Sequence, residues 1–158
     1  SVAGEFAEPA MGGHLFDLYC GVGTLSLFMA DRARKVTGIE VVDVAVQNAR
    51  FNAKENGVGN AEFVLGDMKD TFNEPFLEKH GIPDCVITDP PRSGMHPDVV
   101  EQLCRLQTNR LVYVSCNPST MARDLKTLKE FYRVETVQPV DMFPQTYHIE
   151  AVAKLTRI

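Results

Sequence analysis

Short apolar runs alternate with amphipathic segments along nearly the whole chain. Apolar runs of strand length, bounded by polar or turn-forming residues, predict strands. They cover residues 15–20, 35–40, 61–65, 84–89, 110–116, 134–140 and 147–155. Apolar positions that recur every three or four residues predict helices between them. These helices cover 24–31, 43–57, 97–106 and a segment that begins at 118.

Local residues mark the ends of two of these helices. Asp43 is a candidate N-cap, and Gly57 is suited to end the helix that follows it. Asn117 and Pro118 resemble the N-cap and first residue of the last helix. Both signals support the helical interpretation of these segments.

The alternation of strands and helices predicts a doubly wound α/β fold with a mostly parallel, seven-stranded sheet. The last two strands are joined by a loop without a helical pattern, so one antiparallel strand is expected near the C-terminal edge. Ligands bind such sheets outside the carboxyl ends of the strands. Residues 14–158 form the predicted domain, and the loop-like residues 1–13 are interpreted as a domain junction or a remnant of cloning.

The ends of the first three strands carry a candidate cofactor site. Gly21 and Gly23 precede Thr24, and glycines let a backbone turn tightly and approach a ligand. Position 26 is Ser26, whereas a dinucleotide site favours a third glycine there. A nucleoside without a pyrophosphate is therefore expected, and S-adenosylmethionine is the natural candidate.

Two acidic residues extend this candidate site. Glu40 ends the second strand, where a carboxylate can accept both ribose hydroxyls, and Asp67 follows the third strand near the expected adenine edge. Each feature alone has a simpler interpretation, as a turn or a helix cap. The three features after successive strands favour a nucleoside site.

Further strand ends carry candidate chemistry. The fourth strand ends in Asp89 followed by two prolines, which stiffen the loop and remove two N–H donors. Cys116 lies where the fifth strand stops and a helix begins, and thiols at helix N-termini ionise more readily. The last strand carries His148 and Glu150.

One reaction needs a cysteine, a base and a methyl donor together. Carbon 5 of uracil is too weak a nucleophile to take a methyl group unaided. A thiolate added at C6 raises the electron density on C5, and a base must then remove the C5 proton. Cys116 is the candidate nucleophile and Glu150 the candidate base.

These residues also have plain structural interpretations. A lone cysteine is usually a small buried apolar residue, which is the interpretation favoured for Cys20, Cys85 and Cys104. Glu150 can equally be an edge residue that faces water, and His148 can be an orienting or a surface residue. A basic row is interpreted as a solvated helix face rather than an RNA contact; it consists of Arg123, Lys126, Lys129 and Arg133.

Composition adds constraints on compartment and partners. The net charge is −5, whereas RNA-binding surfaces are usually basic. The four cysteines are widely spaced and no cluster has zinc-ligand spacing, so reduced thiols, a cytoplasmic location and no metal are expected. No secretory signal and no apolar run of membrane-spanning length is visible.

The chain resembles the RNA 5-methyluridine methyltransferases that act on tRNA and ribosomal RNA. The resemblance rests on DLYCGVGT at 17–24, DPPR at 89–92, SCNP at 115–118 and DMFPQT followed by HIE at 141–150. It implies a Rossmann-like class I methyltransferase fold, with Cys116 as nucleophile and Glu150 as base. It also implies that five residues contact the methyl donor or the target base: Tyr19, Thr24, Glu40, Asp67 and Asp89.

The chain also departs from the pattern of that family. Members usually carry an RNA-binding β-barrel and an insert domain before the methyltransferase domain, and some hold an iron–sulfur cluster. The chain lacks these, as well as an upstream glutamine that helps to hold the cofactor. We therefore expect an excised, monomeric catalytic domain whose RNA contacts are mainly made by the missing domains, which would also explain the acidic charge.

Three other functions remain open at this stage. An amino-group methyltransferase favours an aromatic residue where this chain has Arg92, and it needs no cysteine. A nicotinamide oxidoreductase is disfavoured by Ser26 in place of the third glycine. A truncated S-adenosylmethionine-binding module without activity of its own is compatible with every motif above.

Overall fold

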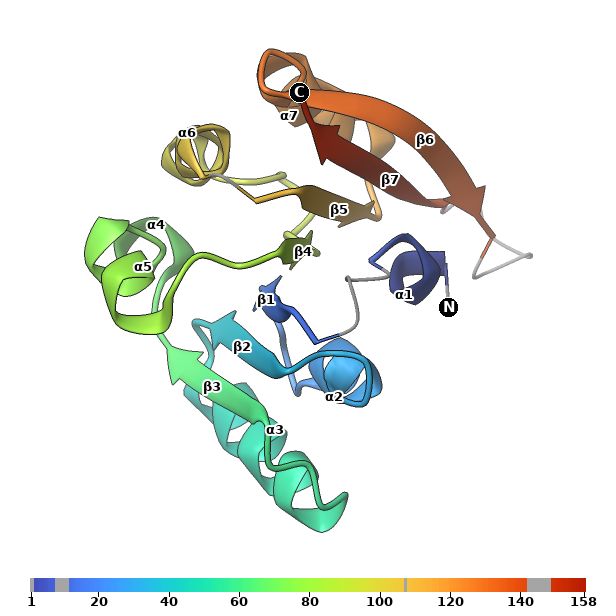
Figure 1. Ribbon diagram of the computed structural model, residues 1–158. Helices are drawn as coiled ribbons and strands as arrows, with labels where there is room; N and C mark the ends of the chain where they lie inside the picture. Colours follow the sequence, from blue (N-terminus) through green and yellow to red (C-terminus); the bar gives the residue numbers. More distant parts are fainter. Residues whose placement is uncertain (1, 8–11, 107, 142–148) are drawn as a thin grey trace.

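A single mixed sheet organises the molecule (Figure 1). The computed structural model describes residues 2–7, 12–106, 108–141 and 149–158. The strand order is β3-β2-β1-β4-β5-β7-β6, and β7 alone runs antiparallel to its two neighbours. The strands are β1 (His14–Leu18), β2 (Lys35–Glu40), β3 (Ala61–Leu65), β4 (Cys85–Thr88), β5 (Arg110–Ser115), β6 (Tyr132–Val140) and β7 (Glu150–Arg157).

Helices cover both faces of the sheet, as the doubly wound prediction requires. On one face lie α1 (Val2–Phe6), α2 (Thr24–Ala30) and α3 (Asp43–Glu55). On the other face lie α4 (Met68–Thr71), α5 (Glu74–His80), α6 (Pro97–Arg105) and α7 (Pro118–Leu128). The predicted seven-stranded α/β sheet with one antiparallel strand near its C-terminal edge is confirmed.

The cap predictions are confirmed at one helix and corrected at another. The Asn117 side chain accepts a hydrogen bond from the Ser119 N–H, and Pro118 begins α7. Asp43 is instead the first residue of α3, and its carboxylate accepts from the Gln47 amide at 2.6 Å. The N-cap there is Val42, so the predicted cap is wrong by one residue, a common error at helix ends.

Three short helices were not predicted. The segment 1–13 looked loop-like, but Val2–Phe6 form α1, which packs against β5, β7 and α2. The interpretation of this segment as a junction stays a prediction. The segment between β3 and β4 forms α4 and α5, whose Phe72 and Phe76 are buried in the core against Phe16. Such short helices depend on tertiary packing, because a periodic pattern needs more turns to be visible.

Two strand ends differ from prediction in ways that matter for the site. β1 stops at Leu18 because Tyr19 adopts a left-handed backbone with φ 64°. The described part of β7 begins at Glu150, whereas the prediction began at residue 147. Residues 147 and 148, including His148, lie outside the described residues.

Candidate functional site

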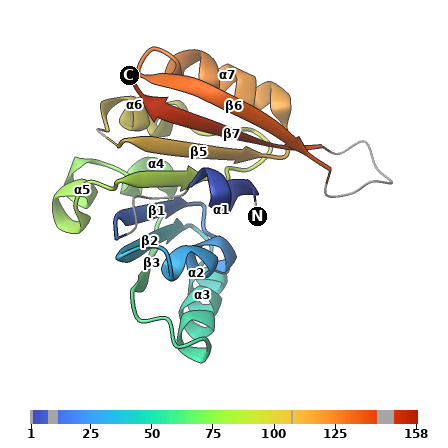
Figure 2. The ribbon, with the colours of Figure 1, turned by 45° about the vertical axis from the view of Figure 1, so that its right-hand side comes forward.

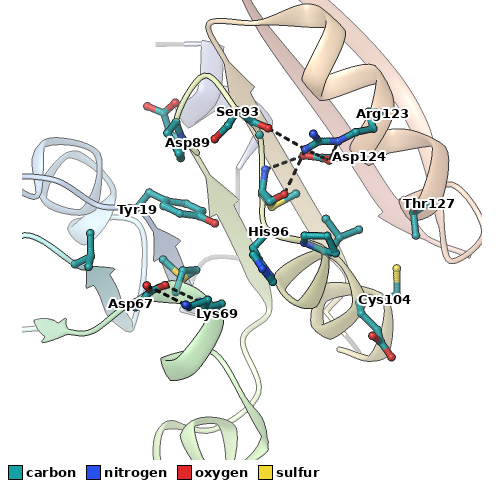
Figure 3. Close-up of a pocket in the computed structure, with 18 of the residues that line it drawn as sticks. Tyr19, Asp67, Lys69, Asp89, Ser93, His96, Cys104, Arg123, Asp124 and Thr127 are labelled. Carbon is teal, nitrogen blue, oxygen red and sulfur yellow. Dashed lines mark hydrogen bonds and ion pairs between the residues drawn. The ribbon is translucent and has the colours of Figure 1, made fainter.

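A cavity of about 1290 Å³ opens at the carboxyl edge of the sheet and continues between α6 and α7 (Figure 3). Four of the residues predicted for the site line it: Tyr19, Glu40, Asp67 and Asp89. The cavity wall does not include Gly21, Gly23, Thr24, Cys116 or Glu150. Its volume is above the usual range of about 300 to 1,000 Å³ for small-molecule sites.

The glycine turn after β1 has two glycines with different roles. Gly21 has φ 54°, and a Cβ built there would have no heavy atom within 4 Å, so its outer side is open. Gly23 has φ 81°, and a Cβ there would lie 2.9 Å from the ring of Phe63 and 3.1 Å from Ala49. Gly23 therefore lets the turn pack closely on α3 and β3, whereas Gly21 leaves space for a ligand.

Glu40 is held by backbone amides at the end of β2. One carboxylate oxygen accepts from the Gly21 N–H at 3.0 Å, and the other accepts from Val41 and Val42 at 2.9 Å each. A carboxylate has about four lone-pair positions. Three of these positions are used by the amides, and the acceptance of the ribose hydroxyls by Glu40 stays a prediction.

Asp67 lines the cavity and caps a helix at the same time. Its side chain accepts from the Lys69 N–H at 3.2 Å at the start of α4, and the Lys69 ammonium lies 3.8 Å away. The carboxylate is exposed to the cavity, as Figure 3 shows beside Tyr19. The cap and the candidate adenine contact are therefore compatible interpretations of one residue.

Asp17 is a buried acid that sequence reasoning quoted only within a motif. It is the last but one residue of β1 and is 2% exposed. Its carboxylate accepts a hydrogen bond from the Ser26 hydroxyl at 2.5 Å. Burial, followed by the charges of Asp89 and Glu40, raises its pKa to about 7, although the Ser26 bond opposes this. The available signal was an acid within the apolar run of a central strand, since such strands are buried on both faces.

Asp89, Cys116 and Glu150 lie at the ends of three adjacent strands. Ser115 pairs with Ala151 in the last rung between β5 and β7, so Cys116 and Glu150 are the next pair beyond it. Because β7 is antiparallel, its first residue reaches the edge where the parallel strands end. Cys116 is half-buried, and Glu150 is likewise partly buried.

Asp89 is influenced by the charge of Glu150. Restricted hydration by the atoms packed around it, and then the charge of Glu150, raise its pKa to about 6, even though Asp89 is an exposed residue on the cavity wall. The influence of Glu150 indicates that the two carboxylates share one region. Strand alternation also assigns Asp17, Asp89 and Glu150 to one face of the sheet.

The cavity wall contains residues that the sequence analysis did not assign to the site. They include Lys69, Ser93, Met95, His96, Arg123 and Asp124. Arg123 was interpreted as part of a solvated helix face, but its guanidinium binds Asp124 and the carbonyls of Ser93 and Met95. The Arg123 side chain is still 56% exposed, as a solvated helix face requires, but a helical pattern cannot reveal that a loop lies beside it.

The described part of the chain contains neither a cluster of metal ligands nor a helix that could span a membrane. Within residues 2–7, 12–106, 108–141 and 149–158, no three metal-ligating side chains of Asp, Glu, His or Cys gather as they would around an ion. Within the same ranges, no helix combines the length and the apolar character needed to cross a bilayer.

The sheet order, with the antiparallel β7, is that of the Rossmann-like class I methyltransferase fold. The chain belongs to the tRNA (uracil-5-)-methyltransferase family, whose model matches residues 5–158. An rRNA methylase from Streptococcus thermophilus shares the fold, with a TM-score of 0.76 over 99% of this chain and 95% of that one at 17% identity.

Closer relatives are similar over the whole of this chain. An uncharacterized RNA methyltransferase of Bacteroides thetaiotaomicron is 50% identical over 98% of this chain and 34% of its own length. The Pyrococcus abyssi tRNA (uracil-54, C5)-methyltransferase, solved in complex with S-adenosyl-L-homocysteine, has a TM-score of 0.83 and 38% identity, covering 98% of this chain and 37% of that one. The chain thus spans about a third of the length of the curated relatives it matches.

Proposed function

We propose that this chain is the catalytic domain of an enzyme that transfers a methyl group from S-adenosylmethionine to C5 of a uridine in RNA. Cys116 is the nucleophile and Glu150 is the base. The observation that supports this most is the register of β5 and β7, which makes Cys116 and Glu150 neighbours across the ladder at the carboxyl edge. Family membership supports the same reaction.

The proposed reaction uses the two residues in sequence. The Cys116 thiolate forms a bond to C6 of the uracil, and the C5–C6 π electrons move onto C5 and O4. C5 would then form its bond to the methyl carbon of the donor, while the bond from that carbon to the donor's sulfonium sulfur breaks and S-adenosylhomocysteine leaves as a neutral thioether. Glu150 takes the proton from C5, the C5–C6 double bond is restored, and the bond between sulfur and C6 breaks to release the thiolate.

The residues around the cavity fit S-adenosylmethionine, which would supply the methyl group when bound. Glu40 keeps one acceptor position for a ribose hydroxyl, and Asp67 offers a carboxylate that is open to the cavity. The Gly21 turn has free space on its outer side, and the Tyr19 side chain lines the wall beside it. The absence of a pyrophosphate-binding third glycine agrees with this nucleoside.

Asp89 is proposed to contact the methyl donor or the target base. Its pKa of about 6 means that ionised and protonated forms exchange near neutral pH, so it can accept or donate a hydrogen bond. Thr24, at the first position of α2, is proposed to support the cofactor turn from outside the cavity wall.

Trapping with RNA that contains 5-fluorouridine tests this function in the full-length protein. Because C5 of 5-fluorouridine carries fluorine in place of hydrogen, the base has no proton to remove from C5. The reaction should therefore stop at a covalent protein–RNA adduct that survives denaturing electrophoresis. Cys116→Ala should form no adduct, whereas Cys104→Ala, which removes another free thiol, should still form it. An adduct with Cys116→Ala would show that another residue is the nucleophile.

A further inference from the structure

The stiff loop between β4 and α6, residues 89–96, is held by hydrogen bonds from side chains of α7 and its N-cap. Figure 3 shows Arg123 and Asp124 reaching Ser93 and the neighbouring backbone from this helix. The Arg92 carbonyl accepts from the Asn117 amide at 3.0 Å and from the Thr120 hydroxyl at 3.2 Å. The loop is therefore attached to the same helix that begins directly after Cys116.

Asp124 is the buried centre of this attachment. It is 4% exposed, and one carboxylate oxygen accepts from the Tyr113 hydroxyl at 2.7 Å and from the Met95 N–H at 2.9 Å. The other oxygen accepts from two nitrogens of Arg123, at 3.0 and 2.8 Å. The four lone-pair positions of the carboxylate are thus all used.

Arg123 adds the second connection between helix and loop. Its guanidinium donates to the Ser93 carbonyl at 3.0 Å and to the Met95 carbonyl at 3.3 Å while it pairs with Asp124. Tyr113 remains a donor to Asp124 because burial and that hydrogen bond raise its pKa well above the ordinary value. Strand β5, helix α7 and the loop are joined at one buried carboxylate.

The loop has no free space at its contact with α7. Gly94 has φ 80°, and a Cβ there would lie 2.9 Å from the Asp124 carboxylate and 3.1 Å from Thr120. It would also collide with the Arg123 guanidinium. Glycine is therefore needed both for the backbone conformation and for the close approach.

An ion pair with one buried and one exposed partner is weak evidence for stability, because removing the buried charge from water offsets the attraction between the two charges. Its distinctive property is the geometry that it imposes. Asp89 lies at one end of the attached loop, and Cys116 lies at the start of the attached helix. The attachment thus determines how far apart these two groups can be.

We propose that Asp124, together with Arg123, positions Asp89 relative to Cys116 for the reaction, a role that rests on the proposed function. Neither residue touches the reacting atoms in this proposal; both act through the loop. Glu40 ends β2 and Asp67 follows β3, and the hydrogen bonds that hold these two carboxylates involve neither the loop nor α7. Loosening the loop should therefore impair methyl transfer while cofactor binding is preserved.

The main test is Asp124→Asn in the full-length protein that carries this chain. Asparagine keeps the size of the side chain but removes its charge. It also replaces one of the two oxygens by an NH2 group, which cannot accept the hydrogen bonds that Asp124 receives. At saturating RNA and cofactor, we expect the single-turnover rate of methyl transfer to fall roughly 100-fold, as a displacement of about 1 Å can cause. The dissociation constant for S-adenosylmethionine, measured by calorimetry, should stay close to that of the wild type.

Gly94→Ala tests the same geometry without removing any contact group of α7. It should push the loop from the helix and reproduce the selective loss of rate. Tyr113→Phe removes only one donor and should have a smaller effect. Lys126→Ala, at an exposed position of α7, is the matched control and should leave the rate unchanged.

The outcomes separate this inference from the proposed function. If the wild type forms no 5-methyluridine, the proposed function fails. If the wild type is active and a folded Asp124→Asn variant, checked by circular dichroism, has the wild-type rate, the positioning role is wrong. Equal loss of cofactor binding and rate would indicate a general structural role and would also overturn the inference.

Discussion

The two halves of the carboxyl edge are built by different means. After β1, β2 and β3, the candidate cofactor site is made by backbone: the Gly21 turn, and three amides that hold the Glu40 carboxylate. After β4 and β5, and at the start of β7, which lies beside β5 in Figure 2, the candidate catalytic site depends on side chains far apart in sequence. Asp124 is at their centre. The first half is determined by local conformation and the second by tertiary contacts.

This difference has a functional meaning under the proposed reaction. A site that binds the same cofactor in every cycle can rely on a preformed turn. A site that must bring a thiolate, a base and a bulky RNA nucleotide into register needs precise spacing between separate strands. The two halves should therefore fail separately when single residues are changed.

The largest expected effect is in the catalytic half, at Glu150. Glu150→Gln in the full-length protein should still allow methyl transfer but slow removal of the C5 proton by about 10²- to 10⁴-fold. RNA that contains ordinary uridine, without fluorine, should then accumulate as a covalent adduct that already carries the methyl group. Denaturing electrophoresis and mass spectrometry detect this adduct. Rapid turnover without a trapped adduct would exclude Glu150 as the base.

In the cofactor half, Glu40→Gln should weaken S-adenosylmethionine binding by about 10- to 100-fold, because a charge-assisted acceptor is lost and the amides around it lose their partner. The reactivity of Cys116 toward iodoacetamide should be unchanged. Calorimetry and mass-spectrometric mapping of alkylation measure the two properties. Glu55→Gln, at an exposed position of α3, is the control. An equal loss of both properties would contradict the separation of the halves.

Asp17 lies between the halves and should make stability depend on pH. Its folded-state pKa of about 7 exceeds the ordinary 3.8, so the folded protein binds the proton more tightly than the unfolded chain. This contribution is fully present below pH 3.8 and is lost as the pH rises through 7. The free energy of unfolding of Asp17→Asn, relative to the wild type, should rise by an amount on the order of 1 kcal/mol or more between about pH 5 and about pH 8.

Urea titrations of both proteins at the two pH values measure this difference. The comparison cancels the other titrating groups, including His14, whose pKa is lowered to about 4 by burial and by Lys35 and Arg34. A difference that does not change with pH would mean that Asp17 is already ionised in the folded protein.

The smallest signal is expected for RNA binding by this chain alone. With a net charge of −5, and with about two thirds of the length of its relatives lying beyond the matched region, it should bind RNA weakly. Fluorescence anisotropy with a labelled tRNA at low and moderate salt measures this. Tight binding, in the sub-micromolar range and sensitive to salt, would assign RNA contacts to this domain.

Particular residues show why the sequence predicted one half better than the other. Gly21, Glu40 and Asp67 each follow a strand closely, so their position depends on a few neighbouring residues. Asp124 lies within a helix that also carries exposed charges, and only its contacts with Tyr113 and Met95 distinguish it. A contact across 29 positions leaves no periodic trace in the sequence.

The sequence by itself determined the succession of the seven strands and of the four longer helices between them, the antiparallel strand near the C-terminal edge, the glycine turn and the location of Cys116 at a strand end. These depend on local periodicity and on turn residues. Only the tertiary structure decided that Glu150 is the neighbour of Cys116, that Asp17 is a buried acid and that Asp124 joins loop and helix. Those features depend on register and burial, which arise when distant segments pack together.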